Sequence, residues 1–203
     1  MNSRNHPLII SDPAGYLASS RPGQKAEKLR SVCVDGSIVP AYVINDQNGC
    51  GVNGAACLAA FASGGAMTFG EALNICKSIA LNGYSRLRGS AVDFYTRLGQ
   101  EAPFIRKCLK ASSVPFGARS GLFVKSRAVR EILAGRPVLL NIGISGQYRD
   151  HTVTAYGFEE WSVGERGRKV LFFRIRDGYS MEDRWLEYKG ILGISVTYLK
   201  PKE

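Results

Sequence analysis

The stretch that decides the fold runs from Asn45 to Leu58 and reads NDQNGCGVNGAACL. A polar turn containing glycine leads directly into a run of small and apolar residues. This pattern predicts a helix that begins at Cys50 and is then buried in a core. A thiol in the first turn of a helix lies at the positive end of the helix dipole, which favours its thiolate form. The sequence therefore predicts that Cys50 is a reactive cysteine, and the other four cysteines have the sequence context of structural residues.

A histidine opens an alternating apolar segment farther along the chain, from His151 to Phe158. The sequence holds two histidines, and His6 lies close to the N-terminus. If a histidine in the folded body activates Cys50, that histidine is therefore His151. Such a base must come within hydrogen-bond reach of the thiol. A helix start facing a strand edge would meet that requirement.

An aspartate follows the next apolar run, at Asp177, and is itself followed by Gly178. Strands joined in a hairpin lie side by side, so Asp177 can reach the segment that starts at His151. Cysteine, histidine and aspartate in this order predict a nucleophile, its base and the residue that orients the base. Asp150 and Asp183 are alternatives for the third residue.

The oxyanion of an acyl-transfer reaction needs hydrogen-bond donors aimed at the developing negative charge. The main-chain N–H of Cys50, at a helix start, is the first candidate. Gln47, Asn45 and Asn48 are candidates for a side-chain donor, and the residues alone do not choose among them.

The composition limits the classes of function. The 203 residues are 45% hydrophobic, enough for a sizeable core, and the net charge is +10. The basic residues are scattered without an RNA-binding motif, so we expect no nucleic-acid partner. Five cysteines without a CxxC pair, together with two histidines, predict no disulfide framework, no metal site and no cofactor. We expect the charge to reflect the basic surface of a soluble protein; an acidic substrate or an anionic membrane face is the alternative.

The order of elements predicts an α+β fold. Residues 1–30 look like a flexible arm with at most a short helix at 24–30, and residues 31–44 suggest a hairpin. The remaining body, within a single domain spanning 31–203, should hold helices first and an antiparallel sheet second. Helices are expected at 50–62, 69–81 (capped by Thr68 and Glu71), 90–98, 102–110 and 126–133. Strands are expected at 137–144, 151–158, 170–175, 185–188 and 194–199.

These residues resemble the papain-like cysteine peptidases over about residues 40–190. The segment HTVTAYGF, beginning at His151, is similar to the histidine strand of that family, and FFRIRDGYSMEDRWLEY is similar to the segment of its third catalytic residue. The resemblance implies two lobes, one helical and one an antiparallel sheet, with the active site in the cleft between them. Gly49-Cys50-Gly51 resembles the nucleophile segment of bacterial peptidases that trim double-glycine leader peptides.

Ubiquitin-specific and viral leader proteases are a second comparison, through the spacing of Asn45, Asn48, Cys50 and Asn53. The chain departs from the papain-like pattern at one point. That family carries its oxyanion glutamine six residues before the cysteine, where this chain has Ile44. The ubiquitin-specific pattern instead implies Asn45.

The resemblance implies a cysteine peptidase that hydrolyses peptide or isopeptide bonds in a protein or peptide substrate. An acyltransferase or transglutaminase with the same three residues is one alternative, and a non-catalytic binding module for an acidic partner is another. The sequence shows no secretory signal and no apolar stretch that would predict a membrane span. We therefore expect a cytoplasmic enzyme, or an effector delivered into a host cell through the arm 1–30; the oligomeric state is not predicted.

Overall fold

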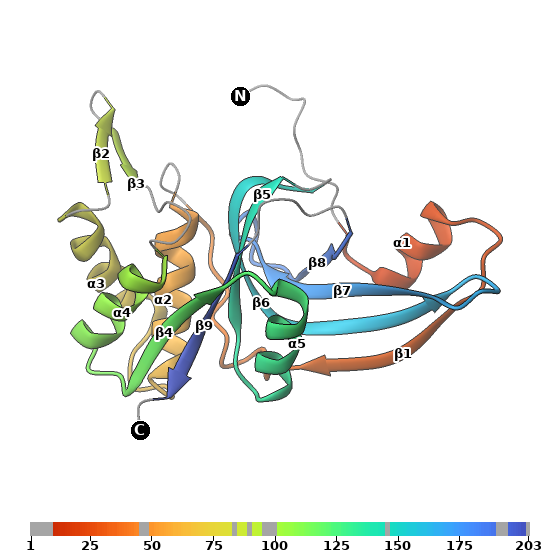
Figure 1. The fold of residues 1–203 in the computed structure, drawn as a ribbon. Helices are drawn as coiled ribbons and strands as arrows, with labels where there is room; N and C mark the ends of the chain where they lie inside the picture. Colours follow the sequence, from red (N-terminus) through yellow and green to blue (C-terminus); the bar gives the residue numbers. More distant parts are fainter. Residues whose placement is uncertain are drawn as a thin grey trace.

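The computed structural model describes residues 10–44, 49–82, 85–88, 91–94, 101–144, 147–189 and 195–201. Helices dominate the first part of the chain and antiparallel strands the second (Figure 1). The α+β class expected from the sequence is therefore confirmed.

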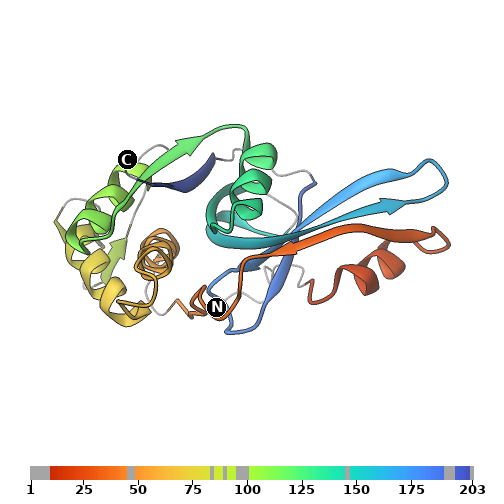
Figure 2. The same ribbon diagram turned by 90° about the horizontal axis from the view of Figure 1, so that it is seen from below.

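Three helices form one side of the molecule: α2 (Cys50–Ala62), α3 (Phe69–Leu81) and α4 (Glu101–Ala111) (Figure 2). Their mutual core consists mainly of small residues, so the helices pack closely. The start of α3 is fixed by the expected capping box. Thr68 Oγ1 accepts a hydrogen bond from the Glu71 N–H at 3.3 Å, and Glu71 Oε2 accepts one from the Thr68 N–H at 2.8 Å.

A seven-stranded antiparallel sheet forms the centre of the structure. Six strands follow the order β4-β9-β5-β6-β7-β8, and β1 pairs with β6 outside this path. The strands are β1 (Ala26–Cys33), β4 (Phe116–Gly121), β5 (Val138–Ile144), β6 (Arg149–Val163), β7 (Arg168–Arg176), β8 (Arg184–Glu187) and β9 (Ser195–Pro201).

Helices cover both faces of this sheet. Leu139 of β5 packs into the core of α2, α3 and α4, whereas Leu140 packs into the core that contains Ala128 and Ile132 of α5 (Val124–Leu133). Successive side chains of a strand point to opposite faces. The three-helix group and α5 therefore lie on opposite sides of β5.

Strand β6 is longer than the sequence predicted, because two strands share one of its edges. Its first half pairs with β5, from Ile144↔Arg149 to Val138↔Ala155. Its second half pairs with β1, from Cys33↔Gly157 to Ala26↔Val163. Gly157 lies where the partner changes, and a Cβ there would come within 3.0 Å of the Val32 carbonyl oxygen. Any other residue here would require β1 to shift slightly away from β6.

The N-terminal segment differs from the expected arm. Asp12 caps α1 (Pro13–Ser20), and the buried residues Ile10 and Leu17 pack against Phe172 and its neighbours in β6 and β7. The short helix expected at 24–30 is wrong, because this segment forms β1. Its backbone hydrogen bonds go to β6 instead of closing helical turns. Residues 1–9 lie outside the described residues.

Two further expectations need correction, and one strand was missed. No second strand follows β1 within residues 34–44, so the predicted hairpin is absent there; Asp35 instead accepts hydrogen bonds from the Ser37 main chain and side chain. Strands β2 (Ser85–Arg88) and β3 (Ala91–Phe94) pair where a helix at 90–98 was expected, and the rest of that range lies outside the described residues. Valine and phenylalanine in this short segment favour strand over helix. Strand β4 was not predicted.

Within the described residues, no helix has the length and apolar character needed to cross a bilayer. The same residues place no group of three or more His, Cys, Asp or Glu side chains where they could hold a metal ion.

Candidate active site

Helix α2 brings Cys50 to the sheet because Gly54, one turn later, has no side chain. A Cβ at Gly54 would lie 3.0 Å from Leu139 Cδ2 and 3.6 Å from Thr152 Cγ2. The helix axis can therefore approach β5 and β6 at this point, with Cys50 as the first helical residue. The cysteine lies at the N-terminus of a helix that has no acidic residue in its first turn. Both features favour a thiolate.

The thiol of Cys50 and the imidazole of His151 are hydrogen-bonded to each other. His151 is almost fully buried, near the start of β6 opposite Ile142 of β5. Cys50 also forms hydrogen bonds with Thr152, the next residue of β6. The structure thus brings together the cysteine and the histidine that the sequence predicted as nucleophile and base.

The environment of this pair favours its ionised form. Burial alone raises the pKa of the Cys50 thiol, but the hydrogen bond and positive charge of His151 outweigh it, so the pKa lies below its ordinary value. For His151, burial lowers the pKa, and contact with Cys50 reverses this and brings the pKa above its ordinary value. Burial without such a partner raises the pKa of Cys57 to about 12. The contact between the two groups therefore shifts Cys50 toward the thiolate and His151 toward the imidazolium, whereas Cys57 is shifted the opposite way.

The second ring nitrogen of His151 fixes which atom faces the thiol. His151 Nε2 lies 2.7 Å from the main-chain carbonyl oxygen of Asp177. A carbonyl oxygen only accepts, so Nε2 carries a proton and donates it. Nδ1 is then the nitrogen left to exchange a proton with Cys50.

Asp177 therefore contacts His151 through its main chain and not, as the sequence reasoning assumed, through its carboxylate. The carboxylate is completely buried and accepts three hydrogen bonds of its own. Tyr148 Oη and Arg184 Nη1 donate to Oδ2 at 2.9 and 2.7 Å, and the Tyr179 N–H donates to Oδ1 at 2.9 Å. These bonds hold the turn after β7, and with it the carbonyl that contacts His151.

Two tyrosines lie parallel to the imidazole. The ring centroids of Tyr148 and Tyr179 are 5.3 and 4.8 Å from that of His151, with interplanar angles of 20° and 13°. Tyr148 is buried and Tyr179 is about half exposed. The stacked rings restrict rotation of the imidazole.

Gly178 joins this turn to the segment that precedes residues 45–48. Its φ of +76° lies in the left-handed region, and a Cβ there would overlap the side chain of Ile44. The Ile44 N–H donates to the Gly178 carbonyl oxygen at 2.8 Å. The chain leading toward Cys50 is thus attached directly beside Asp177.

The alternative aspartates occupy different environments. Asp183 is hydrogen-bonded to Tyr156, Arg174 and Arg176, and these partners keep its pKa below the ordinary value although burial opposes this. Asp150 is exposed and has a φ of +46°, an unusual value for a non-glycine residue. Neither shares the hydrogen bond that joins His151 to Asp177.

The oxyanion candidates Gln47, Asn45 and Asn48 lie outside the described residues. The main-chain N–H of Cys50 is in the first turn of α2, where N–H groups have no partner within the helix. It is therefore available as a donor, and the choice of a side-chain partner stays a prediction.

Sequence reasoning missed Thr152, Tyr148 and Arg184. Thr152 Oγ1 donates to Asn141 Oδ1 at 3.0 Å, and Asn141 Nδ2 donates to Ser195 Oγ at 3.0 Å, so a row of polar groups crosses the sheet beneath α2. A threonine, an asparagine and a serine facing a helix are the signal that could have pointed to this row. Tyr148 and Arg184 carry no local signal, because only the tertiary fold brings them to Asp177.

Searches with the sequence found no matching family model and no matching curated protein. The assignment of a function therefore depends on the geometry of Cys50, His151 and Asp177.

Proposed function

We propose that this protein is a cysteine peptidase that hydrolyses peptide or isopeptide bonds through Cys50, His151 and Asp177. The proposal includes a papain-like arrangement, with α2–α4 as the helical lobe, the large sheet as the second lobe and the site in the cleft between them. One observation carries it: a thiol at a helix N-terminus is hydrogen-bonded to an imidazole whose other nitrogen donates to Asp177.

The proposed reaction begins with attack of the Cys50 thiolate on the substrate carbonyl carbon, forming a C–S bond. The oxyanion accepts a hydrogen bond from the Cys50 main-chain N–H, joined by a side chain such as that of Gln47 or Asn45. The His151 imidazolium gives its proton to the leaving nitrogen as the C–N bond breaks. His151 then removes a proton from water, which attacks the thioester and releases the acid and the thiolate.

Removal of either partner should abolish turnover. The experiment measures hydrolysis of a pool of fluorogenic peptides by the wild-type protein and by Cys50→Ala, His151→Ala and the matched control Cys33→Ala. We expect a loss of about 10³-fold or more in kcat/KM for the first two variants and little change for Cys33→Ala, with similar Tm values throughout. Undiminished hydrolysis by folded Cys50→Ala would refute the proposal. The proposal would also be refuted if the wild-type protein cleaved no peptide and Cys50 did not react with a peptidyl epoxide.

Acyl transfer would use the same acyl-enzyme but release it to an amine instead of water. The masses of the products formed with and without a primary amine in the assay separate the two reactions. Hydrolysed product as the main species when the amine is present supports the peptidase; a dominant amide product supports the transferase.

A further inference from the structure

The outer face of α5 carries apolar side chains that nothing in the described structure covers. Phe123 and Leu122, at the start of the helix, are 85% and 76% exposed, the two highest values among the large apolar residues described. Leu133, at the other end, is 52% exposed. Exposed apolar side chains of this size at both ends of one short helix are candidates for an interaction surface. We call Leu122, Phe123 and Leu133, with the basic residues described next, the α5 face.

Two of these apolar residues, Phe123 and Leu133, belong to one exposed row along the helix. Phe123, Ser126, Arg130 and Leu133 follow each other at intervals of three and four and are all exposed, whereas Val124, Ala128 and Ile132 are buried against the sheet. Helix α5 lies on the side of the sheet opposite α2–α4 (Figure 2).

Basic side chains surround this row. Residues 119–136 contain five basic residues and one acidic residue. The acidic residue, Glu131, is buried and forms its shortest ion pair with Arg136 at 2.7 Å. Arg130 has a side chain 63% exposed, and Lys125 and Arg119 are exposed as well. The α5 face therefore combines protruding apolar groups with a net positive charge.

The sequence of α5 is poorly suited to stabilise the helix itself. Its N-cap residue is Phe123, and no side chain among the described residues caps the helix. Serine, threonine, aspartate or asparagine is preferred at this position, and acidic residues are preferred in the first turn, where α5 has Lys125. An exposed phenylalanine in place of a cap is accounted for if it contacts something outside the protein.

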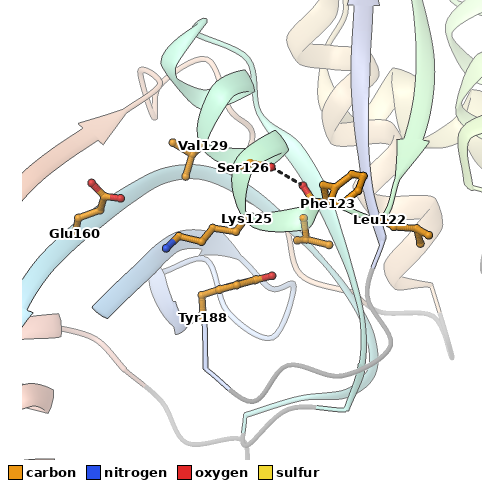
Figure 3. Close-up of a pocket in the computed structure, with 8 residues that line it drawn as sticks. Leu122, Phe123, Lys125, Ser126, Val129, Glu160 and Tyr188 are labelled. Carbon is orange, nitrogen blue, oxygen red and sulfur yellow. Dashed lines mark hydrogen bonds between the residues drawn. The ribbon is translucent and has the colours of Figure 1, made fainter. Parts of the chain in front are cut away.

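A pocket of about 400 Å³ adjoins the start of α5. Leu122, Phe123 and Val129 provide apolar walls, and Lys125 extends above Tyr188 at another side (Figure 3). The acidic residue of the lining, Glu160, is paired with Arg30 at 3.0 Å. The pocket thus continues the apolar and basic character of the α5 face.

We propose that the α5 face docks onto an anionic phospholipid membrane. Leu122, Phe123 and Leu133 enter the boundary between headgroups and acyl chains, and Lys125, Arg130 and Arg119 contact the anionic headgroups. The charge favours this occupant over a second copy of the chain, because two molecules of net charge +10 repel each other. Side chains that protrude from both ends of a helix suit a deformable lipid interface better than the rigid surface of an acidic protein.

The test measures co-sedimentation of the full chain with vesicles of phosphatidylcholine alone or with roughly 30% phosphatidylserine. We expect binding only to the phosphatidylserine vesicles, weakened by added salt. The pair Leu122→Ala with Phe123→Ala should reduce it about tenfold or more, and so should Lys125→Glu with Arg130→Glu.

Matched controls carry the same chemical changes elsewhere. Leu29→Ala with Leu81→Ala removes two exposed leucines, and Lys110→Glu with Lys200→Glu changes the net charge by the same amount; both should retain binding. Circular dichroism establishes that each variant is folded. Absence of binding to phosphatidylserine vesicles at low salt would overturn the proposal. Equal losses in the controls would do so as well, and so would binding to soluble polyglutamate but not to vesicles. The result is independent of peptidase activity.

Discussion

At the scale of single residues, the decisive contrast is between two thiols. Cys50 is hydrogen-bonded to a buried imidazole, which brings its pKa below the ordinary value. Cys33 is exposed, but partial burial of its sulfur raises its pKa despite the nearby Arg174. Exposure favours reaction at Cys33, whereas the lowered pKa favours reaction at Cys50. A chemical probe can therefore tell which of the two properties governs thiol reactivity.

Iodoacetamide labelling across pH, followed by peptide mapping, should reveal this contrast. A lowered pKa keeps the thiolate populated as the pH falls, so at about pH 6 Cys50 should react at least tenfold faster than Cys33. In His151→Ala the burial of Cys50 is no longer compensated, and the advantage should vanish at that pH. Faster labelling of Cys33 than of Cys50 at low pH would contradict both the pKa direction and the peptidase, and would favour the non-catalytic binding module.

Asp177→Asn separates the main-chain role of Asp177 from a carboxylate role. An asparagine keeps the carbonyl that accepts from His151 Nε2, so kcat/KM should fall by less than about 30-fold, whereas loss of an orienting carboxylate would cost about 10⁴-fold. The free energy of unfolding should nevertheless drop by about 2–4 kcal/mol, because Arg184 loses its buried ionic partner. Steady-state kinetics and urea denaturation measure the two effects. A loss of about 10⁴-fold in kcat/KM with an unchanged free energy of unfolding would show that the Asp177 carboxylate, not its main chain, orients His151.

The sequence named three residues that lie together, but it could not choose the contacting atom of Asp177. Residue type suggests a carboxylate, while the direction of a main-chain carbonyl follows from the turn after β7. That turn depends on Gly178, Tyr148 and Arg184, which are brought together only by the tertiary fold. Such contacts between residues distant in the sequence cannot be predicted from local composition.

At the scale of elements, the approach of α2 to the sheet sets the position of the thiol. Glycine inside a helix ordinarily costs about 1 kcal/mol relative to alanine. In α2 this cost is offset by contact between the helix backbone and Leu139. The position of Cys50 thus depends on the absence of a methyl group one turn away.

Gly54→Ala should therefore destabilise the protein although it improves helix propensity. The added methyl would crowd Leu139 Cδ2 at 3.0 Å, at a cost of about 1–3 kcal/mol, and would push the start of α2 from His151. Gly70→Ala in α3 is the matched control, since no atom lies within 4 Å of its added Cβ; it should stabilise by up to about 1 kcal/mol. Thermal unfolding and Cys50 labelling rates test both. If Gly54→Ala were more stable than the wild type and Cys50 were labelled at the normal rate, the added methyl group would fit between α2 and Leu139.

Elements with strong local signals were predicted well. Helix α2 spans the predicted residues, and the capping box fixes the start of α3 where Thr68 and Glu71 indicated. The segment near Ser90 carries a similar spacing of serine and aspartate, yet β3 forms there. A capping pattern without a long apolar periodicity behind it is a weak signal, and strand pairing overrides it.

At the scale of the whole molecule, residues 10–33 are part of the folded body, because α1 packs against β6 and β7 and β1 is a strand of the sheet. The sequence predicted a flexible arm over residues 1–30, because residues 1–23 are rich in serine, asparagine, proline and glycine. No short-range pattern in this segment predicts the pairing of β1 with β6. The partner lies more than a hundred residues away in sequence. Such long-range pairing is the part of a fold that local reasoning handles least well.

Leu17→Ala tests whether this segment contributes to the common core. The side chain is fully buried against β6 and β7, so its truncation should lower the free energy of unfolding by about 2–5 kcal/mol. Leu81→Ala, which shortens an exposed leucine at the end of α3, should change it by less than about 0.5 kcal/mol. Urea denaturation provides both values. Equal values for the two variants would mean that α1 is dispensable to the fold.

The left-handed backbone conformation of Asp150 bears on attempts to raise the thermal stability of this protein. Glycine adopts a φ of +46° without the steric penalty that aspartate bears, so Asp150→Gly would relieve local strain. The same change would give the backbone immediately before His151 more conformational freedom. Asp150→Gly would then raise thermal stability and at the same time make proton transfer by His151 less efficient.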